Sequence, residues 1–131
     1  MSTNFYLRAK PCDKCALSPP DIHLGKRSAG WRFLVQGYRG EMPGYMPAGV
    51  TSWADLQALC LEMINNGWRI VDDYDRELTF GEFKTEVDAT QLWRGLPSKN
   101  HCEYMAANHP DAMEDEAVDA EGWPVSFREF S

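Results

Sequence analysis

Two helix-start patterns in the middle of the chain constrain the fold more than any other feature of the sequence. Ser52 is followed three residues later by Asp55, and Thr79 is followed by Glu82 at the same spacing. In this arrangement the first side chain accepts a hydrogen bond from the backbone N–H three residues on, which caps the first turn of a helix. The sequence therefore predicts two helices, one beginning after Ser52 and one after Thr79.

Apolar residues at helical spacing follow each start. In the first helix they are Trp53, Leu56, Cys60, Met63 and Ile64, and in the second they are Phe80, Phe83 and Val87. We expect the first helix to end at Gly67, which suits a left-handed stop, and the second to continue to about Trp93. Residues 68–71 lie between the two helices and are typical of a strand.

Alternating or apolar segments predict further strands at residues 4–9, 22–25, 31–38 and 125–130. Residues 39–50 hold three glycines and two prolines, which predict a loop. A chain of 131 residues with 44% apolar side chains can bury a core of its own. We therefore expect one α+β domain over residues 1–131, with a small antiparallel sheet and two helices on one face.

A pair of cysteines near the N-terminus indicates a metal site. Cys12 and Cys15 are separated by two residues, a spacing that lets both sulfurs contact one ion from a tight turn, and His23 can supply a third ligand. The candidates for a fourth ligand are His101, Cys102 and His109. We select His101 and predict a structural Zn²⁺ that braces the N-terminal turn against the C-terminal region.

Two other readings of the cysteine pair are less favoured. A redox dithiol normally opens a helix, whereas Pro19 and Pro20 follow this pair closely and no helix can begin there. A catalytic zinc ion is not supported, because the chain has no HExxH motif and no glutamate placed to act as a general base. We therefore expect no enzymatic activity.

Charge is divided unevenly along the chain. Residues 1–50 carry seven Lys and Arg against three Asp and Glu, while residues 51–131 carry six against seventeen. Phosphates repel acidic surfaces, so a contact with nucleic acid would have to use the first third of the chain. No segment has the length and apolar character of a membrane helix or secretory signal, and we expect a cytoplasmic protein without membrane contact.

Three polar segments are weighed as contact sites. The loop at residues 25–30, Gly-Lys-Arg-Ser-Ala-Gly, offers Lys26 and Arg27 as cationic contacts, although an ordinary basic turn fits it as well. Residues 72–77 are better explained as a solvated turn before a helix than as a cation site. The acidic residues 111–121 form either a flexible solubilising loop or a surface that imitates nucleic acid phosphates. In the second case the contacting residues are Glu114, Asp115, Glu116 and Asp119.

The sequence also resembles a group of small uncharacterised proteins encoded by bacteriophages and prophages. The resemblance lies in the N-terminal MSTNFYLR, the CDKC pair, the HLGKRSAGW segment, the Asp-rich IVDDYDRELTFGEF and the terminal EGWPVSFREFS. It covers about half of the chain. It implies a phage-encoded accessory protein with Cys12, Cys15 and His23 at the motif positions and a late histidine that His101 matches. It implies no known activity.

These observations lead to two expected functions. The first is counter-defence by binding a host protein in the host cytoplasm, for example by inhibiting a CRISPR-type nuclease complex. The alternative is a zinc-containing nucleic-acid-binding module, which would use the cations Arg8, Lys10, Lys14, Lys26 and Arg27. The five tryptophans are mostly at apolar-periodic positions and are expected in the core, not in a base-stacking platform.

Overall fold

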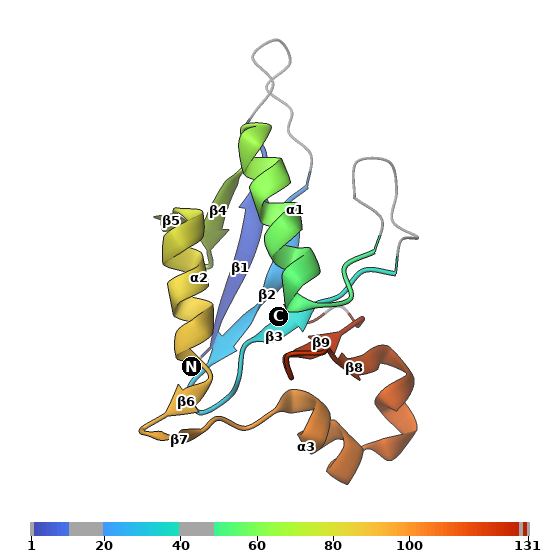
Figure 1. Ribbon diagram of the computed structural model, residues 1–131. Coiled ribbons are helices and arrows are strands. Elements are labelled where there is room, and N and C mark those ends of the chain that lie inside the picture. The colour runs from blue at the N-terminus through green and yellow to red at the C-terminus, as the bar shows by residue number, and fades with distance from the viewer. Residues whose placement is uncertain (1, 11–19, 40–48, 129, 131) are drawn as a thin grey trace.

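The computed structural model describes residues 2–10, 20–39, 49–128 and 130. The strands are β1 (Ser2–Arg8), β2 (Ile22–Ser28), β3 (Leu34–Gln36), β4 (Arg69–Asp72), β5 (Glu77–Leu78), β6 (Leu92–Trp93), β7 (Leu96–Pro97), β8 (Glu116–Val118) and β9 (Pro124–Ser126). The helices are α1 (Trp53–Asn65), α2 (Phe80–Ala89), α3 (His101–Asn108) and the 3-10 helix η1 (Pro110–Asp115). The expected α+β class is confirmed (Figure 1).

The described strands form a large mixed sheet and a small hairpin. The large sheet has seven strands in the order β5-β4-β1-β2-β3-β9-β8, and β6 pairs with β7. The prediction of an antiparallel sheet is wrong for one pair, because β9 lies parallel to β3, with Val35 opposite Val125. A parallel pair joins segments that are far apart in sequence, and the period of the side chains does not reveal the direction of their pairing.

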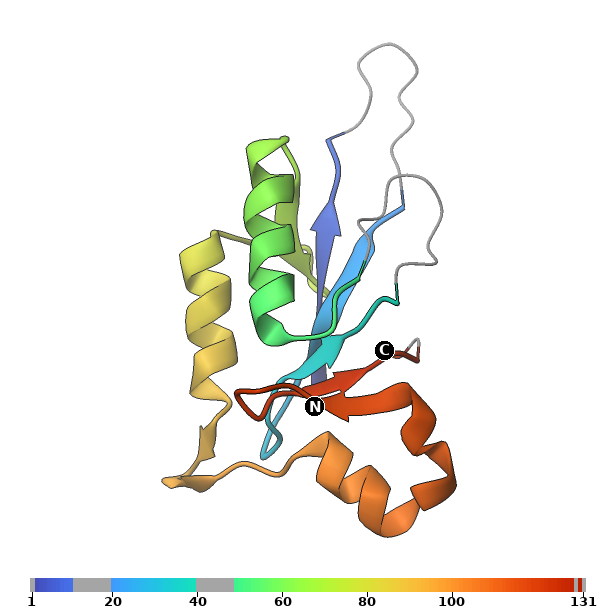
Figure 2. The same cartoon turned by 45° about the vertical axis from the view of Figure 1, so that its right-hand side comes forward.

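The two predicted helices are confirmed, and both cover the same face of the large sheet (Figures 1 and 2). Ser52 accepts a hydrogen bond from the Asp55 backbone N–H at 3.0 Å. Thr79 and Glu82 form the complete capping box, each side chain accepting from the other residue's backbone N–H. The caps therefore determine where both helices begin.

The second helix ends earlier than the sequence predicts, at Ala89 instead of about Trp93. The Thr90 hydroxyl donates to the Val87 carbonyl at 2.6 Å and accepts from the Phe33 backbone N–H at 2.8 Å. Through these two bonds Thr90 ends the helix and connects its last turn to the segment that leads into β3. Leu92 and Trp93 then form the first strand of the β6–β7 hairpin.

A buried aromatic cluster occupies the space between the sheet and the two helices. Its members, all at most 2% exposed, are Phe5, Phe33, Trp53, Phe83 and Trp123. Neighbouring ring centroids are 5.2 to 6.1 Å apart, within the range of favourable aromatic contacts. A side chain at Gly25 would come within 2.4 Å of the Phe33 ring, so the sheet reaches this packing only with glycine there.

The acidic segment is ordered, which corrects the expectation of a flexible loop at residues 111–121. Its first part forms η1 and its second part forms β8, which pairs with β9. Asp119 accepts hydrogen bonds from the backbone N–H groups of Trp53 and Trp123, both at 2.8 Å. This carboxylate joins the start of α1 to the turn before β9, so the segment is held by contacts distant in sequence.

None of the helices in the described part of the chain combines the length and the apolar character that a membrane span requires.

Candidate functional site

The predicted zinc ligands are described only in part. Cys12 and Cys15 lie outside the described residues. Among the residues that the structure describes, no three His, Cys, Asp or Glu side chains gather closely enough to hold a metal ion. His23 and His101, the two described members of the predicted site, have different partners.

His23 lies on β2 with each ring nitrogen facing an amide oxygen. Its Nε2 is 2.9 Å from Asn4 Oδ1, and its Nδ1 is 3.1 Å from Gln36 Oε1. The amide of Asn4 donates to Asp73, and that of Gln36 donates to backbone carbonyls, so the oxygen of each amide must face His23. Both ring nitrogens therefore have a hydrogen-bond partner, and which of them donates depends on the tautomer. Zinc binding at His23 would require the loss of one of these hydrogen bonds.

His101 is the first residue of α3 and lies against β8. Its Nε2 is 3.4 Å from Glu116 Oε2, and the Glu116 side chain is only 1% exposed. Glu116 Oε1 accepts from the Ser126 hydroxyl at 3.1 Å, while Oε2 has no hydrogen-bond partner among the described residues. His101 is thus the neighbour that can compensate this buried carboxylate.

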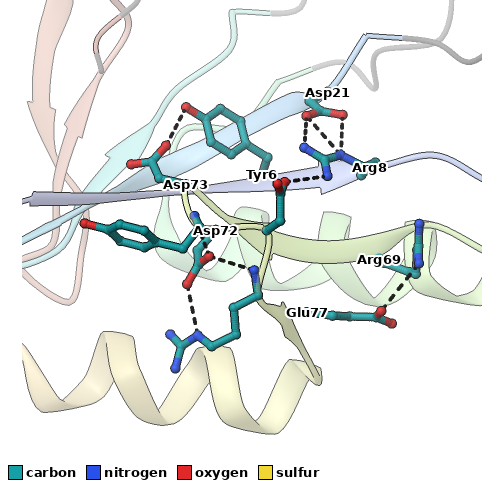
Figure 3. A network of polar contacts seen from close by, with 10 residues as sticks. Tyr6, Arg8, Asp21, Arg69, Asp72, Asp73 and Glu77 are labelled. Atoms are coloured by element: carbon teal, nitrogen blue, oxygen red, sulfur yellow. Dashed lines mark hydrogen bonds and ion pairs between the residues drawn. The ribbon is translucent and has the colours of Figure 1, made fainter.

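Some cations of the N-terminal third are paired with carboxylates. Arg8 contacts Asp21 and Asp75, each at 3.0 Å, and Figure 3 shows the contact between Arg8 and Asp21. Hydrogen bonds to these two carboxylates raise the pKa of the Arg8 guanidinium. Arg27, predicted as a partner contact, pairs with Glu86 of α2 at 2.6 Å. Two cations of the basic first third are therefore paired in space with carboxylates of the acidic part of the chain.

Most of the predicted acidic contacts also have internal roles. Asp115 pairs with Arg39 and Arg128, and the hydrogen bond from Arg39 is the main cause that lowers the pKa of its carboxyl. Glu116 is buried and Asp119 accepts backbone N–H groups, as described above. Glu114 is exposed, and its backbone carbonyl accepts from Arg39. These partners reduce the negative charge that residues 111–121 can present to another molecule.

The described cysteines are poor nucleophiles. Burial raises the pKa of the Cys60 thiol to about 12. Burial also raises the pKa of the Cys102 thiol, which donates to the Ala117 carbonyl. Neither thiol has the lowered pKa of a catalytic or redox-active cysteine.

The most prominent exposed apolar surface was not foreseen from the sequence. We call it the aromatic surface; it consists of Trp31, Leu92, Trp93, Leu96 and Tyr104. Four of these side chains are 44 to 70% exposed, while Trp31 is half-buried. A cavity of about 450 Å³ lies beside them, and its lining includes Trp31, Leu92, Trp93 and the paired Arg27 and Glu86. A compact protein has little reason to expose so many large side chains in one place.

The β6–β7 hairpin holds much of this surface in a fixed position. Arg94 and Gly95 form its turn with φ angles of 52° and 81°, which match a two-residue turn with two left-handed residues. Lys99 continues from the hairpin, donating to the Gly30 carbonyl at 2.9 Å and accepting from the Arg32 N–H at 2.8 Å. Backbone hydrogen bonds therefore join the end of the hairpin to the segment between β2 and β3.

Two cations accompany the exposed rings. The Arg94 guanidinium lies 5.3 Å from the centroid of the Trp93 ring, and Lys99 Nζ lies 5.5 Å from that of Trp31. Arginine is a costly choice at a left-handed position, where glycine, asparagine or aspartate is usual. In the sequence, the Arg-Gly pair flanked by two short apolar pairs is the signal that could have predicted this hairpin.

Comparisons of this chain with protein-family models, with curated proteins and with solved structures find no match.

Proposed function

We propose that the protein acts by binding another protein through the aromatic surface. The observation that carries this proposal is the group of exposed large apolar side chains on the β6–β7 hairpin and beside it, accompanied by arginine and lysine. Tryptophan, tyrosine and arginine are the residues that most often dominate the energy of protein interfaces. The backbone under them is already ordered, so little conformational entropy is lost on binding.

The cations indicate the chemistry of the partner. Arg94 and Lys99 lie against the ring faces of Trp93 and Trp31. A complementary partner would place an apolar side chain in the cavity beside Trp93 and carboxylates around it. The partner is therefore expected to present an apolar patch with an acidic rim.

The alternative function, binding of nucleic acid, has less support. It depended on Arg8, Lys10, Lys14, Lys26 and Arg27, of which Arg8 and Arg27 are paired with carboxylates. Nucleic acid affinity comes mainly from cations that replace counterions at phosphates, and paired cations contribute less to it.

The resemblance to phage proteins makes a component of a host defence system, such as a CRISPR-type nuclease complex, the first partner to test.

The structural zinc ion stays part of the proposal. Cys12, Cys15, His23 and His101 have the ligand types that zinc prefers. In the described arrangement His23 already has two amide partners, so zinc would have to compete for one of its ring nitrogens. No step of the proposed protein binding depends on the metal.

The test is affinity capture with three tagged forms of the full chain. The wild type, the double variant Trp93→Ala/Leu96→Ala and the control Tyr74→Ala are compared in a lysate of the bacterial host. Tyr74 is 69% exposed in the turn between β4 and β5, so its loss removes an exposed ring outside the proposed interface. The captured protein is then purified and its affinity for each form is measured by calorimetry.

We expect the double variant to bind at least about 30-fold more weakly, which corresponds to the loss of about 2 kcal/mol at a central aromatic contact. The control should bind like the wild type. Equal affinity of all three forms would place the interface elsewhere. Salt-sensitive binding of single- or double-stranded oligonucleotides by the wild type, with no protein captured, would favour the nucleic-acid alternative.

A further inference from the structure

The ionic contacts of the arginines distinguish Arg94 from most of the others. The structure describes all eight arginines, and six of them pair with carboxylates at 3.4 Å or less: Arg8, Arg27, Arg39, Arg69, Arg76 and Arg128. Arg32 lies over the ring of the buried Trp123. Arg94 is exposed and, among the described residues, neither it nor Lys99 contacts a carboxylate. The aromatic surface therefore carries two cations that a carboxylate of another molecule can reach.

The backbone at Arg94 indicates that folding alone does not explain this arginine. Its φ of 52° is left-handed, and asparagine, aspartate and glycine are preferred at this position of a two-residue hairpin turn. A larger side chain in this conformation costs free energy of folding. The contact of the guanidinium with the exposed Trp93 ring, at 5.3 Å, contributes little in return. A bound anionic group would explain why arginine is present at the tip of the hairpin.

Two indole rings line the cavity of about 450 Å³ beside the hairpin. Trp93 packs across the turn that follows β2, because a side chain at Gly30 would lie 3.8 Å from its Cδ1 atom. Trp31 is the next residue in that turn and lines the same cavity. A ring that enters the cavity would therefore contact indole surface, and a cation lies over each of the two indoles.

The charges in the lining of the cavity are compensated within the chain. Arg27 pairs with Glu86 at 2.6 Å, and Arg76 contacts the same carboxylate at 2.9 Å. Arg76 also pairs with Asp72 at 2.9 Å, so the two guanidinium groups meet two carboxylates. Among the residues given for the lining, only Arg27 and Glu86 are charged. The cavity therefore suits an uncharged group, whereas the cations over its indoles suit carboxylates.

We propose that the aromatic surface recognises an acidic linear segment of its protein partner, in which carboxylates flank one aromatic side chain. The aromatic side chain occupies the cavity, the flanking carboxylates pair with Arg94 and Lys99, and Arg94 determines the preference for negative charge. This inference rests on the proposed function and narrows the partner from a protein surface to a short segment. A short segment suffices, because the cavity and both cations belong to the aromatic surface and its immediate neighbours.

Titration of the ¹⁵N-labelled full chain with synthetic peptides, followed by NMR, tests the proposed chemistry. The probe is acetyl-Asp-Glu-Phe-Glu-Asp-amide. One control peptide replaces the acidic residues by Asn and Gln of the same shape, and another replaces Phe by Ala. We expect the probe to shift the indole N–H signals of Trp31 and Trp93 with a dissociation constant on the order of 1 mM, and each control to bind at least about fivefold more weakly. Equal binding of the Asn and Gln peptide would overturn the charge argument, and equal binding of the Ala peptide would overturn the ring argument.

Variants of the chain test the role of Arg94. Arg94→Asn keeps a residue that suits the turn and removes the charge, so it should weaken binding of the probe about fivefold and raise Tm by about 2 °C. Arg94→Lys, which keeps the charge, should retain most of the affinity. The control Arg69→Gln changes an arginine that is 46% exposed and pairs with Glu77 outside the aromatic surface, and it should bind like the wild type. Unchanged binding by Arg94→Asn, or a lower Tm, would contradict the role of Arg94.

The capture experiment separates failure of this inference from failure of the proposed function. A captured protein that binds the Trp93→Ala/Leu96→Ala variant weakly but Arg94→Asn like the wild type would leave the interface in place and overturn the acidic segment. A captured protein that binds the Trp93→Ala/Leu96→Ala variant like the wild type would overturn the proposed function itself. Weaker binding by both variants, but not by Arg69→Gln, would support both proposals.

Discussion

The buried aromatic cluster and the aromatic surface use the same residue types in opposite ways. Trp53 and Phe83 lie on the inner stripes of α1 and α2 and are at most 2% exposed, whereas Trp93 on the hairpin is 44% exposed. Burying a large aromatic side chain contributes about 2 to 3 kcal/mol to stability. The exposed rings contribute little to folding, so their apolar area remains available for a contact between molecules.

The largest expected effect follows from removing a ring of the buried cluster. Phe83→Ala should reduce the free energy of unfolding by about 3 to 5 kcal/mol, because Phe83 is fully buried and contacts the rings of Phe5, Phe33 and Trp53. Urea denaturation measures this change. The control Phe83→Leu, which keeps most of the volume, should cost much less. A loss below about 1 kcal/mol for Phe83→Ala would contradict the assignment of this ring to the core.

An intermediate and pH-dependent effect is expected at Asp72, a buried carboxylate at the end of β4. Burial raises the pKa of this carboxyl, but the backbone N–H groups of Arg76 and Tyr74 and the Arg76 guanidinium lower it further than burial raises it. Its oxygens accept these bonds at 2.9 to 3.0 Å, and Figure 3 shows Asp72 with its polar contacts. Asp72→Asn should cost about 1 to 2 kcal/mol at pH 7.

The sign of this pH dependence follows from the lowered pKa. The contribution of Asp72 is fully present above the pKa of an unfolded aspartate, about 3.9, and is lost as the pH falls through the lower folded-state pKa. Unfolding curves of the wild type and of Asp72→Asn should therefore converge as the pH falls below the pKa of an unfolded aspartate and through the lower folded-state pKa. Glu77→Gln is the control, because its exposed pair with Arg69 should contribute almost nothing. A gap between the wild type and Asp72→Asn that persists at the acidic end would contradict this account.

The smallest effect on stability is expected at the aromatic surface. Trp93→Ala should change the free energy of unfolding by no more than about 0.5 kcal/mol, because the side chain is exposed. The same urea denaturation measures it. A cost above about 2 kcal/mol would show that Trp93 supports the fold, and the contrast between the two aromatic groups would then disappear.

Local signals predicted the elements that depend on neighbouring residues. The starts of α1 and α2 follow from the caps at Ser52 and Thr79, and the Asp-rich turn after β4 forms with Asp75 at a φ of 59°. These features depend on hydrogen bonds between residues two to four positions apart, such as the bond from the Tyr74 N–H to Asp72 Oδ1. A pattern in the sequence can therefore specify them.

The candidate sites were predicted much less completely. Trp93 was expected near the end of a helix, but Thr90 ends α2 through its hydrogen bond with Phe33, which lies 57 positions away in the sequence. Arg27 was expected as a cationic contact for a partner, but it pairs with Glu86 of α2. The predicted pair Cys12 and Cys15 lies outside the described residues and stays a prediction. Contacts between residues so far apart in sequence produce no periodic pattern of residue types from which they could be predicted.

The sequence by itself determined the α+β class, the starts of both sheet-covering helices and the apolar stripes that they bury. Caps and helical spacing act within a few residues, so they operate in any context that allows a helix to form. Only the tertiary structure decided that β9 lies parallel to β3, that the acidic segment folds against Trp53 and Trp123, and that Trp31 lines a cavity together with Leu92 and Trp93. These features depend on which segments, distant in sequence, pack against one another when the core forms. The burial of apolar side chains from the whole chain, and no local pattern, selects that packing.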